Sequence, residues 1–425
     1  MTFRFIHTAD LHLDSPLVSL ALRDRDLAER LGVASRAALS AIVDLCLAEQ
    51  VDALLIAGDL WDGSQASAKT PGMLKAELRR LDAAGIRCFI IRGNHDAISK
   101  VTRELDPPPN TVVFGARAKT HRFEAGGHEI AVHGLSFADP HAPQSLLPLY
   151  PVAVAGAFNI GMMHTSLNGA EGHDIYAPCS LAELDAFSYD YWALGHIHRR
   201  AEYHGRAAVV MAGIPQGRDI GEAGPASVTM GTLSDAGVLT LSQHSVASLR
   251  FERLEVDVTA AEDWPGLLQL LERALGAAAR APRPEEHLVL RPRLTGASAL
   301  AWRIARDLGR LAQEAESLAS GHAGLWIDKL ENATHAPDGA GAEHLPDELS
   351  RIVLEDLPQD AGLLAALDQA MAELQRDLPA DLAGMFGDDE GAAARARATL
   401  LSEGSAALLS RLTLGNTASG SGEEA

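Results

Sequence analysis

The chain has 425 residues, of which 47% are hydrophobic, and its formal net charge is −21. This length exceeds one compact domain and the apolar content suffices for buried cores, so the numbers exclude a generally disordered protein and predict two or more domains. The acidity argues against a protein that coats nucleic acid by charge alone, because backbone binding relies on Lys and Arg displacing counterions.

The acidity is concentrated in the second half of the chain. Residues 1–250 hold 21 Lys and Arg against 27 Asp and Glu, a net charge of −6, whereas residues 251–425 hold 15 against 30, a net charge of −15. Two acids of the first half, Asp10 and Asp59, are candidate metal ligands that bound metal would neutralise. A functional face in the first half can therefore be locally positive.

Membrane insertion and export are not expected. No stretch approaches the roughly 18 apolar residues that cross a bilayer, and the apolar segment Phe3 to Ile6 is too short for a signal peptide. Candidate ligand Asp10 lies where a signal sequence would be removed. We therefore expect a cytoplasmic protein without membrane contact. The three cysteines lie in or beside apolar runs, which indicates reduced core thiols.

Short apolar runs in the first 200 residues predict the buried strands of one sheet. They are Phe3 to Ile6, Ala53 to Ile56, Cys88 to Ile91, Ile160 to Met163 and Tyr191 to Leu194. Between the first three runs, helices are predicted over Ser35 to Glu49, with Ser35 as N-cap, and over Pro71 to Ala83. Open α/β sheets bind ligands at the carboxyl ends of their strands, so groups that follow these runs can meet in one cleft.

Between residues 110 and 250 the pattern favours further strands with Gly-rich turns. They are predicted at Thr111 to Phe114, Glu129 to Gly134, Ala207 to Ala212, Ser227 to Leu233 and Val238 to His244. We expect them to form a second sheet packed against the first. The fold class predicted for residues 1–250 is a layered α/β sandwich, two sheets flanked by helices.

The remaining chain predicts two more regions and a tail. Residues 251–335 have a βαβαβ pattern, with strands at 251–258, 287–294 and 324–330 and helices at 264–279 and 299–318. Residues 345–415 predict a helical region, with helices at 348–355, 360–376 and 392–412. The tail 416–425 is predicted to be disordered.

Polar motifs follow the five apolar runs. In chain order they are Asp10-Leu-His12, Gly58-Asp59, Gly93-Asn94-His95-Asp96, His164 and Gly195-His196-Ile-His198. An isolated Asp-x-His or Gly-Asp is common and by itself is read as structural. The longer motifs are rarer, and five in the order expected for one sheet favour a shared site.

The motifs supply ligands for two metal ions. Two ions about 3.5 to 4 Å apart can hold a bridging hydroxide, neutralise phosphate oxygens and align an in-line displacement. The Asp-x-His and His-x-His pairs are each expected to leave a strand in extended form, because alternate residues then face the same way. The predicted first ion is bound by Asp10, His12 and His198, the second by Asn94, His164 and His196, and Asp59 bridges them. Nitrogen and oxygen ligands without thiolate fit manganese, iron or zinc better than magnesium or calcium.

The third motif also predicts catalytic residues. His95 is expected to face the substrate, where it stabilises the pentacovalent phosphate or protonates the leaving oxygen. Asp96 is expected to orient that imidazole and raise its basicity. Gly58, Gly93 and Gly195 are expected to let the backbone turn sharply before each ligand.

These residues resemble the calcineurin-like metallophosphoesterases and, within them, DNA repair exonucleases of the SbcD and YhaO type. The resemblance covers residues 1 to about 250. It lies in residues 7–16 (HTADLHLDSP), 57–62 (AGDLWD), 92–96 (RGNHD), 190–198 (DYWALGHIH) and 213–218 (GIPQGR).

The resemblance implies a function. It implies two manganese ions on the seven ligands above, His95 as the catalytic histidine beside Asp96, DNA as substrate, and a coiled-coil ATPase of the SbcC type as partner. A homodimer is a further family expectation. Residues 251–330 are similar in position to the family's DNA-facing capping domain, but they are acidic and match weakly.

The sequence therefore predicts a two-metal phosphodiesterase, a DNA exonuclease acting in DNA repair, in which the bridging hydroxide attacks the phosphodiester. Two alternatives stay open: a phosphoesterase for nucleotides or other small molecules, and a regulatory subunit of a coiled-coil ATPase. The helical region has an apolar stripe that either packs within the chain or contacts the partner ATPase. The stripe comprises Leu363, Leu364, Leu367, Met371 and Leu374.

Overall fold

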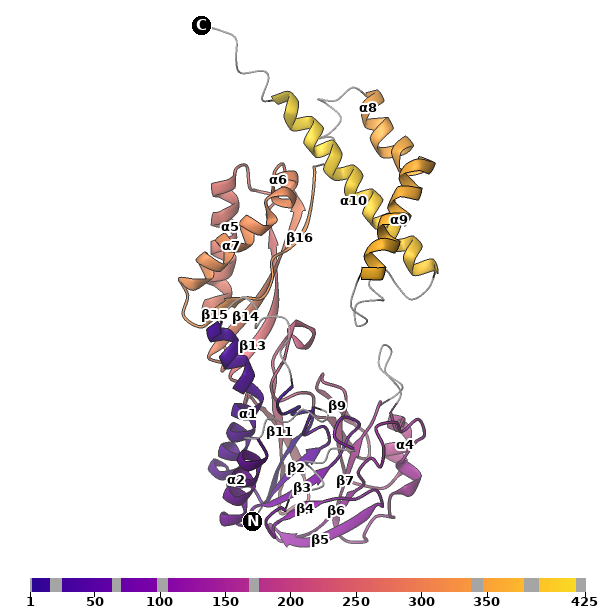
Figure 1. Cartoon of the computed structure of the whole chain (residues 1–425). Helices are drawn as coiled ribbons and strands as arrows, with labels where there is room; N and C mark the ends of the chain where they lie inside the picture. The colour runs from indigo at the N-terminus through magenta and orange to yellow at the C-terminus, as the bar shows by residue number, and fades with distance from the viewer. Residues whose placement is uncertain are drawn as a thin grey trace. The chain divides into compact units, whose positions relative to one another are not determined.

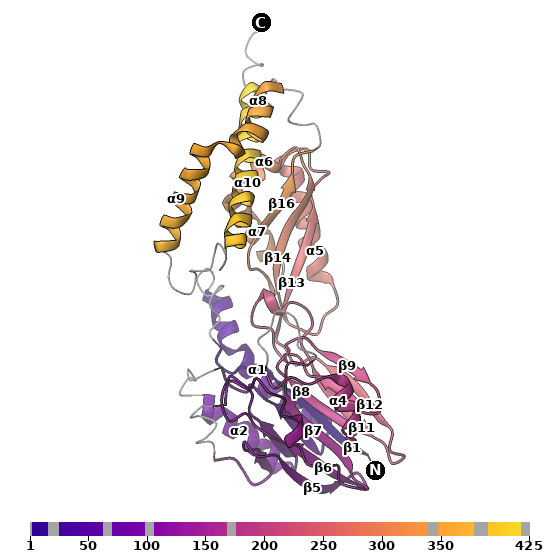
Figure 2. The ribbon, with the colours of Figure 1, turned by 90° about the vertical axis from the view of Figure 1, so that its right-hand side faces the viewer.

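The computed structural model describes residues 2–15, 25–62, 70–97, 106–167, 176–337, 347–377 and 390–417 (Figures 1 and 2). The chain divides into two compact units. The first comprises Met1–Arg253, Ala281–Leu290 and Gly324–Asp328, and the second Leu254–Arg280, Arg291–Ala323 and Lys329–Ala425. No helix among the described residues is both long and apolar enough to cross a bilayer.

The first unit contains a six-stranded sheet in the order β12-β11-β1-β2-β3-β4. Strands β1 to β4 run parallel, whereas β11 pairs antiparallel with both β1 and β12. The strands are β1 (Phe3–Thr8), β2 (Ala53–Ala57), β3 (Arg87–Ile91), β4 (Thr111–Val113), β11 (Val228–Leu233) and β12 (Leu239–His244). Helices α1 (Arg25–Ala48) and α2 (Thr70–Ala83) connect the first three strands and lie together beside this sheet (Figure 1).

A second six-stranded sheet has the order β5-β6-β7-β8-β10-β9. Its four inner strands are parallel and its two edge strands antiparallel. The strands are β5 (Lys119–Ala125), β6 (His128–Gly134), β7 (Phe158–His164), β8 (Tyr191–Gly195), β9 (Ala201–His204) and β10 (Ala208–Met211). Short helical segments η1 (Leu147–Leu149), α4 (Leu181–Ala186) and η2 (Ile220–Glu222) lie in the connections.

The architecture is the layered α/β sandwich expected from the sequence, but the predicted distribution of strands was wrong. The five apolar runs form β1, β2 and β3 of the first sheet and β7 and β8 of the second. The predicted strands at 111–114, 227–233 and 238–244 belong to the first sheet as β4, β11 and β12. Hydrophobicity alone could not assign them, because a strand buried on both faces looks the same in either sheet.

The two sheets pack face to face around an aromatic core. Phe5 of β1 and Phe89 of β3 are buried with Ile160 of β7 and Tyr191 of β8. The rings of Phe5 and Tyr191 meet edge to face with centroids 4.9 Å apart, a geometry that favours aromatic pairs. The opposite face of the first sheet packs against α1 and α2, where Cys46 and Cys88 are buried free thiols, as predicted.

A third sheet has the order β13-β14-β15, and β16 also pairs with β14. Its strands are β13 (Leu249–Asp257), β14 (His287–Ala297), β15 (Leu325–Ile327) and β16 (Glu331–His335), and its helices are α5 (Trp264–Arg280), α6 (Ala301–Arg306) and α7 (Leu308–Ser320). The predicted βαβαβ pattern lacked β16. This strand has the polar sequence ENATH and pairs with the second half of the long strand β14.

The C-terminal region is helical. Its elements are α8 (Asp347–Arg351), η3 (Ile352–Asp356), η4 (Leu357–Gln359), α9 (Ala361–Asp377) and α10 (Glu390–Thr417). In the predicted apolar stripe on α9, Leu363 and Leu374 are exposed, whereas Leu364, Leu367 and Met371 are half-buried. Helix α10 includes the first two residues of the predicted disordered tail, and residues 418–425 lie outside the described residues.

Candidate metal centre

The seven predicted metal ligands lie at or just beyond the carboxyl ends of five strands. Asp10 and His12 follow β1, Asp59 follows β2, and Asn94 follows β3 in the first sheet. From the second sheet, His164 is the last residue of β7, and His196 and His198 follow β8. The structure brings all seven together, because the two sheets present their carboxyl ends at the same edge.

Several ligands have left-handed backbone conformations. The φ angles are +53° for Asp10, +43° for His12, +50° for Asp59 and +103° for His196. Such angles cost about 1 to 3 kcal/mol each for residues other than glycine, and they persist only where the surroundings fix them. Two hydrogen bonds do so here: the amide of Asp10 donates to the carbonyl of Gly58, and that of His12 to the carbonyl of Asp59, both at 3.0 Å.

These angles correct the prediction that both spaced pairs leave their strands in extended form. Asp10 and His12 share one ligand group through their left-handed backbone, whereas His196 and His198 belong to two different groups. The motif spacing was informative, but the extended geometry assumed for it was wrong.

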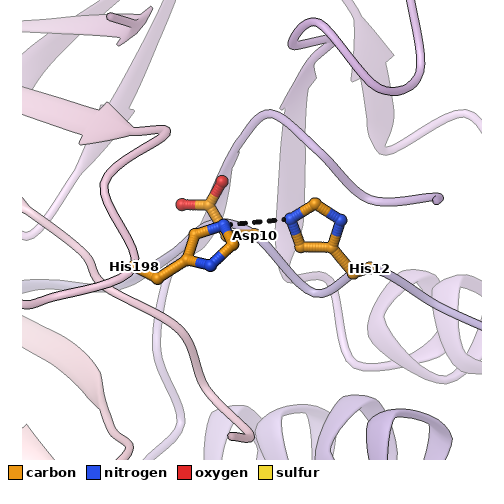
Figure 3. Close-up of side chains that lie close together, drawn as sticks. All are labelled: Asp10, His12 and His198. Atoms are coloured by element: carbon orange, nitrogen blue, oxygen red, sulfur yellow. Dashed lines mark hydrogen bonds between the residues drawn. The ribbon is translucent and has the colours of Figure 1, made fainter. Parts of the chain in front are cut away.

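Asp10, His12 and His198 form the first ligand group (Figure 3). One ligand atom from each residue lies within 4.8 Å of those of the other two. The Nε2 atoms of His12 and His198 are 3.2 Å apart and face each other. Two imidazole nitrogens and a carboxylate at this separation fit the coordination of a transition metal.

Asp59, His164 and His196 form the second ligand group, with the same 4.8 Å limit. Asn94 adds its side-chain oxygen, which lies 3.0 Å from Nε2 of His164. The group therefore offers the imidazole, carboxylate and amide donors that were predicted for the second ion.

Asp59 lies between the two groups. Its Oδ2 atom is 3.2 Å from Nε2 of His164 and 4.0 Å from Nε2 of His12. Its Oδ1 atom accepts a hydrogen bond of 2.9 Å from the amide of His95. This placement suits the predicted bridging role, because one carboxylate oxygen faces a histidine from each group.

Two ligand imidazoles are oriented through Nδ1. His164 donates from Nδ1 to the carbonyl of Ala57 at 3.0 Å, and Nδ1 of His198 is 2.7 Å from the carboxylate of Glu222. Each contact leaves Nε2 directed at the ligand groups. Hydrogen bonds of this kind fix the tautomer and strengthen the ligand.

The buried charges act strongly on each other. Burial alone would raise the pKa of Asp59, but the neighbouring imidazoles, above all His164, hold it well below its usual range. Burial likewise disfavours the charged form of His164, yet Asp59 and Asp10 raise its pKa to about 9. Without metal the centre therefore holds a proton that an ion would have to displace.

The three glycines before the ligands have different roles. Gly58 has a φ of +99°, as expected for a sharp turn. Gly93 and Gly195 have no positive φ and are required by close packing instead. A side chain at Gly93 would collide with Asp59 and with the ring of His164, whose Nε2 would lie only 2.6 Å from the added carbon.

The predicted catalytic histidine is the exposed member of the site. The side chain of His95 is 43% exposed, and its Nδ1 lies 2.8 Å from Oδ1 of Asp62. Asp62 raises the pKa of His95 through this hydrogen bond, which outweighs the opposing effect of partial burial. The ring is therefore held at the rim of the ligand groups with Nε2 available.

Asp62 occupies the position that was predicted for Asp96. Asp96 is fully buried and accepts hydrogen bonds from the amides of Gly93 at 2.7 Å and Leu60 at 3.0 Å. Burial raises its pKa to about 7. The carboxylate thus ties the loop after β3 to the loop after β2, and the partner of the His95 ring comes from the loop after β2.

Sequence reasoning missed three charged residues at the site: Asp62, Arg218 and Glu222. Asp62 ends the stretch 57–62 and Arg218 ends the stretch 213–218, both of which carry the family resemblance, so the signal for these two was present. Glu222 lies in η2 and had no sequence signal, because its role depends on the loop that returns it to His198.

Comparison with known families agrees with this geometry. The sequence model of the calcineurin-like phosphoesterase family matches residues 3–200. The model described as the middle domain of metallophosphoesterase YhaO matches residues 251–335.

Three relatives extend the comparison. The chain is 30% identical over 340 residues to a Bacillus subtilis protein described as an uncharacterized metallophosphoesterase YhaO, covering 78% of this chain and 81% of that protein. It is 25% identical over 219 residues to the DNA double-strand break repair protein Mre11 of Sulfurisphaera tokodaii, covering 50% and 54%. It is 37% identical over 100 residues to a subunit of the nuclease SbcCD from Rhodobacter capsulatus, covering 23% and 22%.

Proposed function

Because the chain belongs to the calcineurin-like metallophosphoesterase family, whose members are metal-dependent phosphoester hydrolases, we propose that it is a DNA exonuclease acting in DNA repair. The observation that supports it best is the convergence of seven ligands and one exposed histidine at one edge of the sandwich. The relatives named for double-strand break repair and as part of a nuclease favour DNA as the substrate.

The centre suits two divalent ions, and we propose manganese. The two ligand groups would each hold one ion, with Asp59 shared. When bound, the ions would neutralise phosphate oxygens and lower the pKa of the attacking water. The donor set contains nitrogen and oxygen atoms but no thiolate, which suits manganese and excludes few of its competitors.

His95 acts on the leaving-group side in this proposal. Asp62 holds Nδ1, so Nε2 is directed away from the carboxylate and can donate a proton to the departing oxygen or to the phosphate. The raised pKa keeps His95 protonated at higher pH than a free histidine. Asp96 contributes by fixing the loop that carries His95 and Asn94.

We further propose a coiled-coil ATPase of the SbcC type as partner, and the cytoplasm as the place of action. The exposed leucines 363 and 374 on α9 provide an apolar contact for a partner helix. Pull-down of such an ATPase by the full chain, and its loss in a Leu363→Asp, Leu374→Asp variant, would test the partner. A homodimer is tested separately by light scattering of the purified chain.

End-labelled linear DNA with manganese provides the main test. We expect stepwise release of nucleotides by the full chain, and loss of at least about 100-fold in rate in His95→Ala. His204→Ala is the matched control, because His204 is 67% exposed and lies on β9 away from the ligands. Hydrolysis of bis(p-nitrophenyl) phosphate and cyclic nucleotides without DNA cleavage would identify a small-molecule phosphoesterase instead.

A further inference from the structure

The loop after β10 contacts two sides of the candidate metal centre. It carries the GIPQGR stretch, Gly213 to Arg218, and leads into η2. We infer that Arg218 and Glu222 form a positioning network that couples the exposed His95 to the metal-ligand candidate His198. This inference rests on the proposed function and assigns a role in it to residues outside the ligand set.

Glu222 is the half of the network nearer the ligands. Its Oε1 atom lies 2.7 Å from Nδ1 of His198 and accepts a hydrogen bond of 2.6 Å from Nη2 of Arg218. Nε of Arg218 donates to the same carboxylate at 3.0 Å, and the backbone amide of Arg218 donates to Oε2 at 2.8 Å. The side chain of Glu222 is only 11% exposed, so these charge-assisted bonds are shielded from water.

Arg218 extends the network toward the catalytic histidine. Its Nη1 atom lies 3.9 Å from Oδ2 of Asp62 and donates to the hydroxyl of Ser15 at 3.4 Å. The other oxygen of Asp62 holds Nδ1 of His95 at 2.8 Å. The result is one continuous series of polar contacts through His95, Asp62, Arg218, Glu222 and His198.

The backbone around the network is constrained. Gly213 has a φ of +71°, and a side chain there would lie 2.7 Å from the amide of Arg200. The amide of Ile214 donates to the carbonyl of His198 at 3.0 Å. Asp219 accepts a 2.6 Å hydrogen bond from Gly221 at the start of η2. The loop is thus fixed against the His198 segment, and it returns Glu222 to Arg218.

The charges explain why both residues are needed. The guanidinium lies between the carboxylates of Asp62 and Glu222, each of which holds one imidazole. Removing Arg218 leaves these carboxylates without their shared cation and frees both to reorient. Removing the charge of Glu222 weakens the hydrogen bond that keeps Nε2 of His198 directed at the first ligand group.

Manganese titration of the full chain tests the network by calorimetry, without a substrate. In Glu222→Gln and in Arg218→Gln we expect one of the two ions to bind roughly 10- to 100-fold more weakly. The double variant should lose less than the product of the two single losses, because the residues act as a unit. Glu202→Gln is the matched control, since Glu202 also contacts an arginine and a histidine but lies outside the site.

Turnover of bis(p-nitrophenyl) phosphate at saturating manganese gives a second readout. We expect Arg218→Gln to lower kcat about 10-fold or more with little change in KM, and Arg218→Lys to recover part of it. Circular dichroism and thermal melting of the metal-free variants check that each remains folded. If Arg218→Gln does not fold, Glu222→Gln with its Glu202→Gln control decides the question.

Wild-type affinity for both ions in Glu222→Gln would overturn the network, and so would strictly multiplicative losses in the double variant. Failure of the proposed function is distinguishable from either result. A chain that cleaves no DNA but loses manganese affinity in Glu222→Gln would refute the exonuclease and retain the network.

Discussion

Nδ1 of His95 lies 2.8 Å from Oδ1 of Asp62, so the exposed histidine of the site is held by a carboxylate from the loop after β2. The contact joins residues 33 positions apart. It also determines which ring nitrogen of His95 remains free to meet a substrate.

Asp62→Asn should lower kcat by about 10- to 100-fold, since a positioned general acid contributes at least that much. Asp62 raises the pKa of His95, so its removal should let His95 lose its proton at lower pH. The alkaline limb of the kcat profile is then expected to move to lower pH. Profiles of both proteins at saturating manganese check this, and an unmoved limb would contradict the assignment.

Asp96→Ala should act on stability before chemistry. The change removes the acceptor for two buried amides, those of Gly93 and Leu60. Leaving buried donors unpaired costs about 1 to 3 kcal/mol for each group. Urea unfolding of the metal-free variant should therefore show a lower free energy of unfolding. An unchanged midpoint would mean that Asp96 does not tie the two loops.

Gly93→Ala should disrupt the second ligand group. The added carbon would collide with Asp59 and His164, and small displacements of reacting groups can cost roughly 100-fold in rate. Gly115→Ala is the matched control, because nothing lies within 4 Å of a side chain there. Calorimetric manganese titration of both variants checks the prediction, which fails if Gly93→Ala binds both ions normally.

Manganese affinity should rise with pH up to about 9. The pKa of His164 is raised to about 9 by Asp59 and Asp10 against the effect of burial, so below that pH the ion must displace a proton. Titrations in buffers of different ionisation enthalpy should report this proton release. Binding without proton release at pH 7 would show that His164 is already neutral.

His7 should make the protein less stable in acid. Burial lowers its pKa from the ordinary 6.5 to about 3, and its Nδ1 lies 2.9 Å from the hydroxyl of Tyr191. The unfolded chain therefore binds the proton first, so stability is full above pH 6.5 and falls as pH drops toward 3, by at most about 1.4 kcal/mol per pH unit. Replacing His7 with Asn should flatten this part of the curve, which urea unfolding between pH 4 and 7 would measure.

The sequence predicted what depends on local pattern. Each apolar run became a strand, and each candidate ligand lies at a strand end, because burial and chain direction are encoded locally. Whether β7 joins β3 or a separate sheet depends on long-range pairing that hydrophobicity does not encode. The same holds for Glu222, whose contact with His198 spans 24 positions, and for the polar strand β16.

Each ligand group draws residues from both sheets. Asp10 and His12 of the first sheet meet His198 of the second, and Asp59 of the first meets His164 and His196 of the second. A bound ion would therefore act as a cross-link between two layers that otherwise adhere through an apolar interface. At 100 times the Kd one such ion adds about 2.7 kcal/mol to the folded state. Cellular manganese supply would then govern the lifetime of the sandwich as well as its turnover.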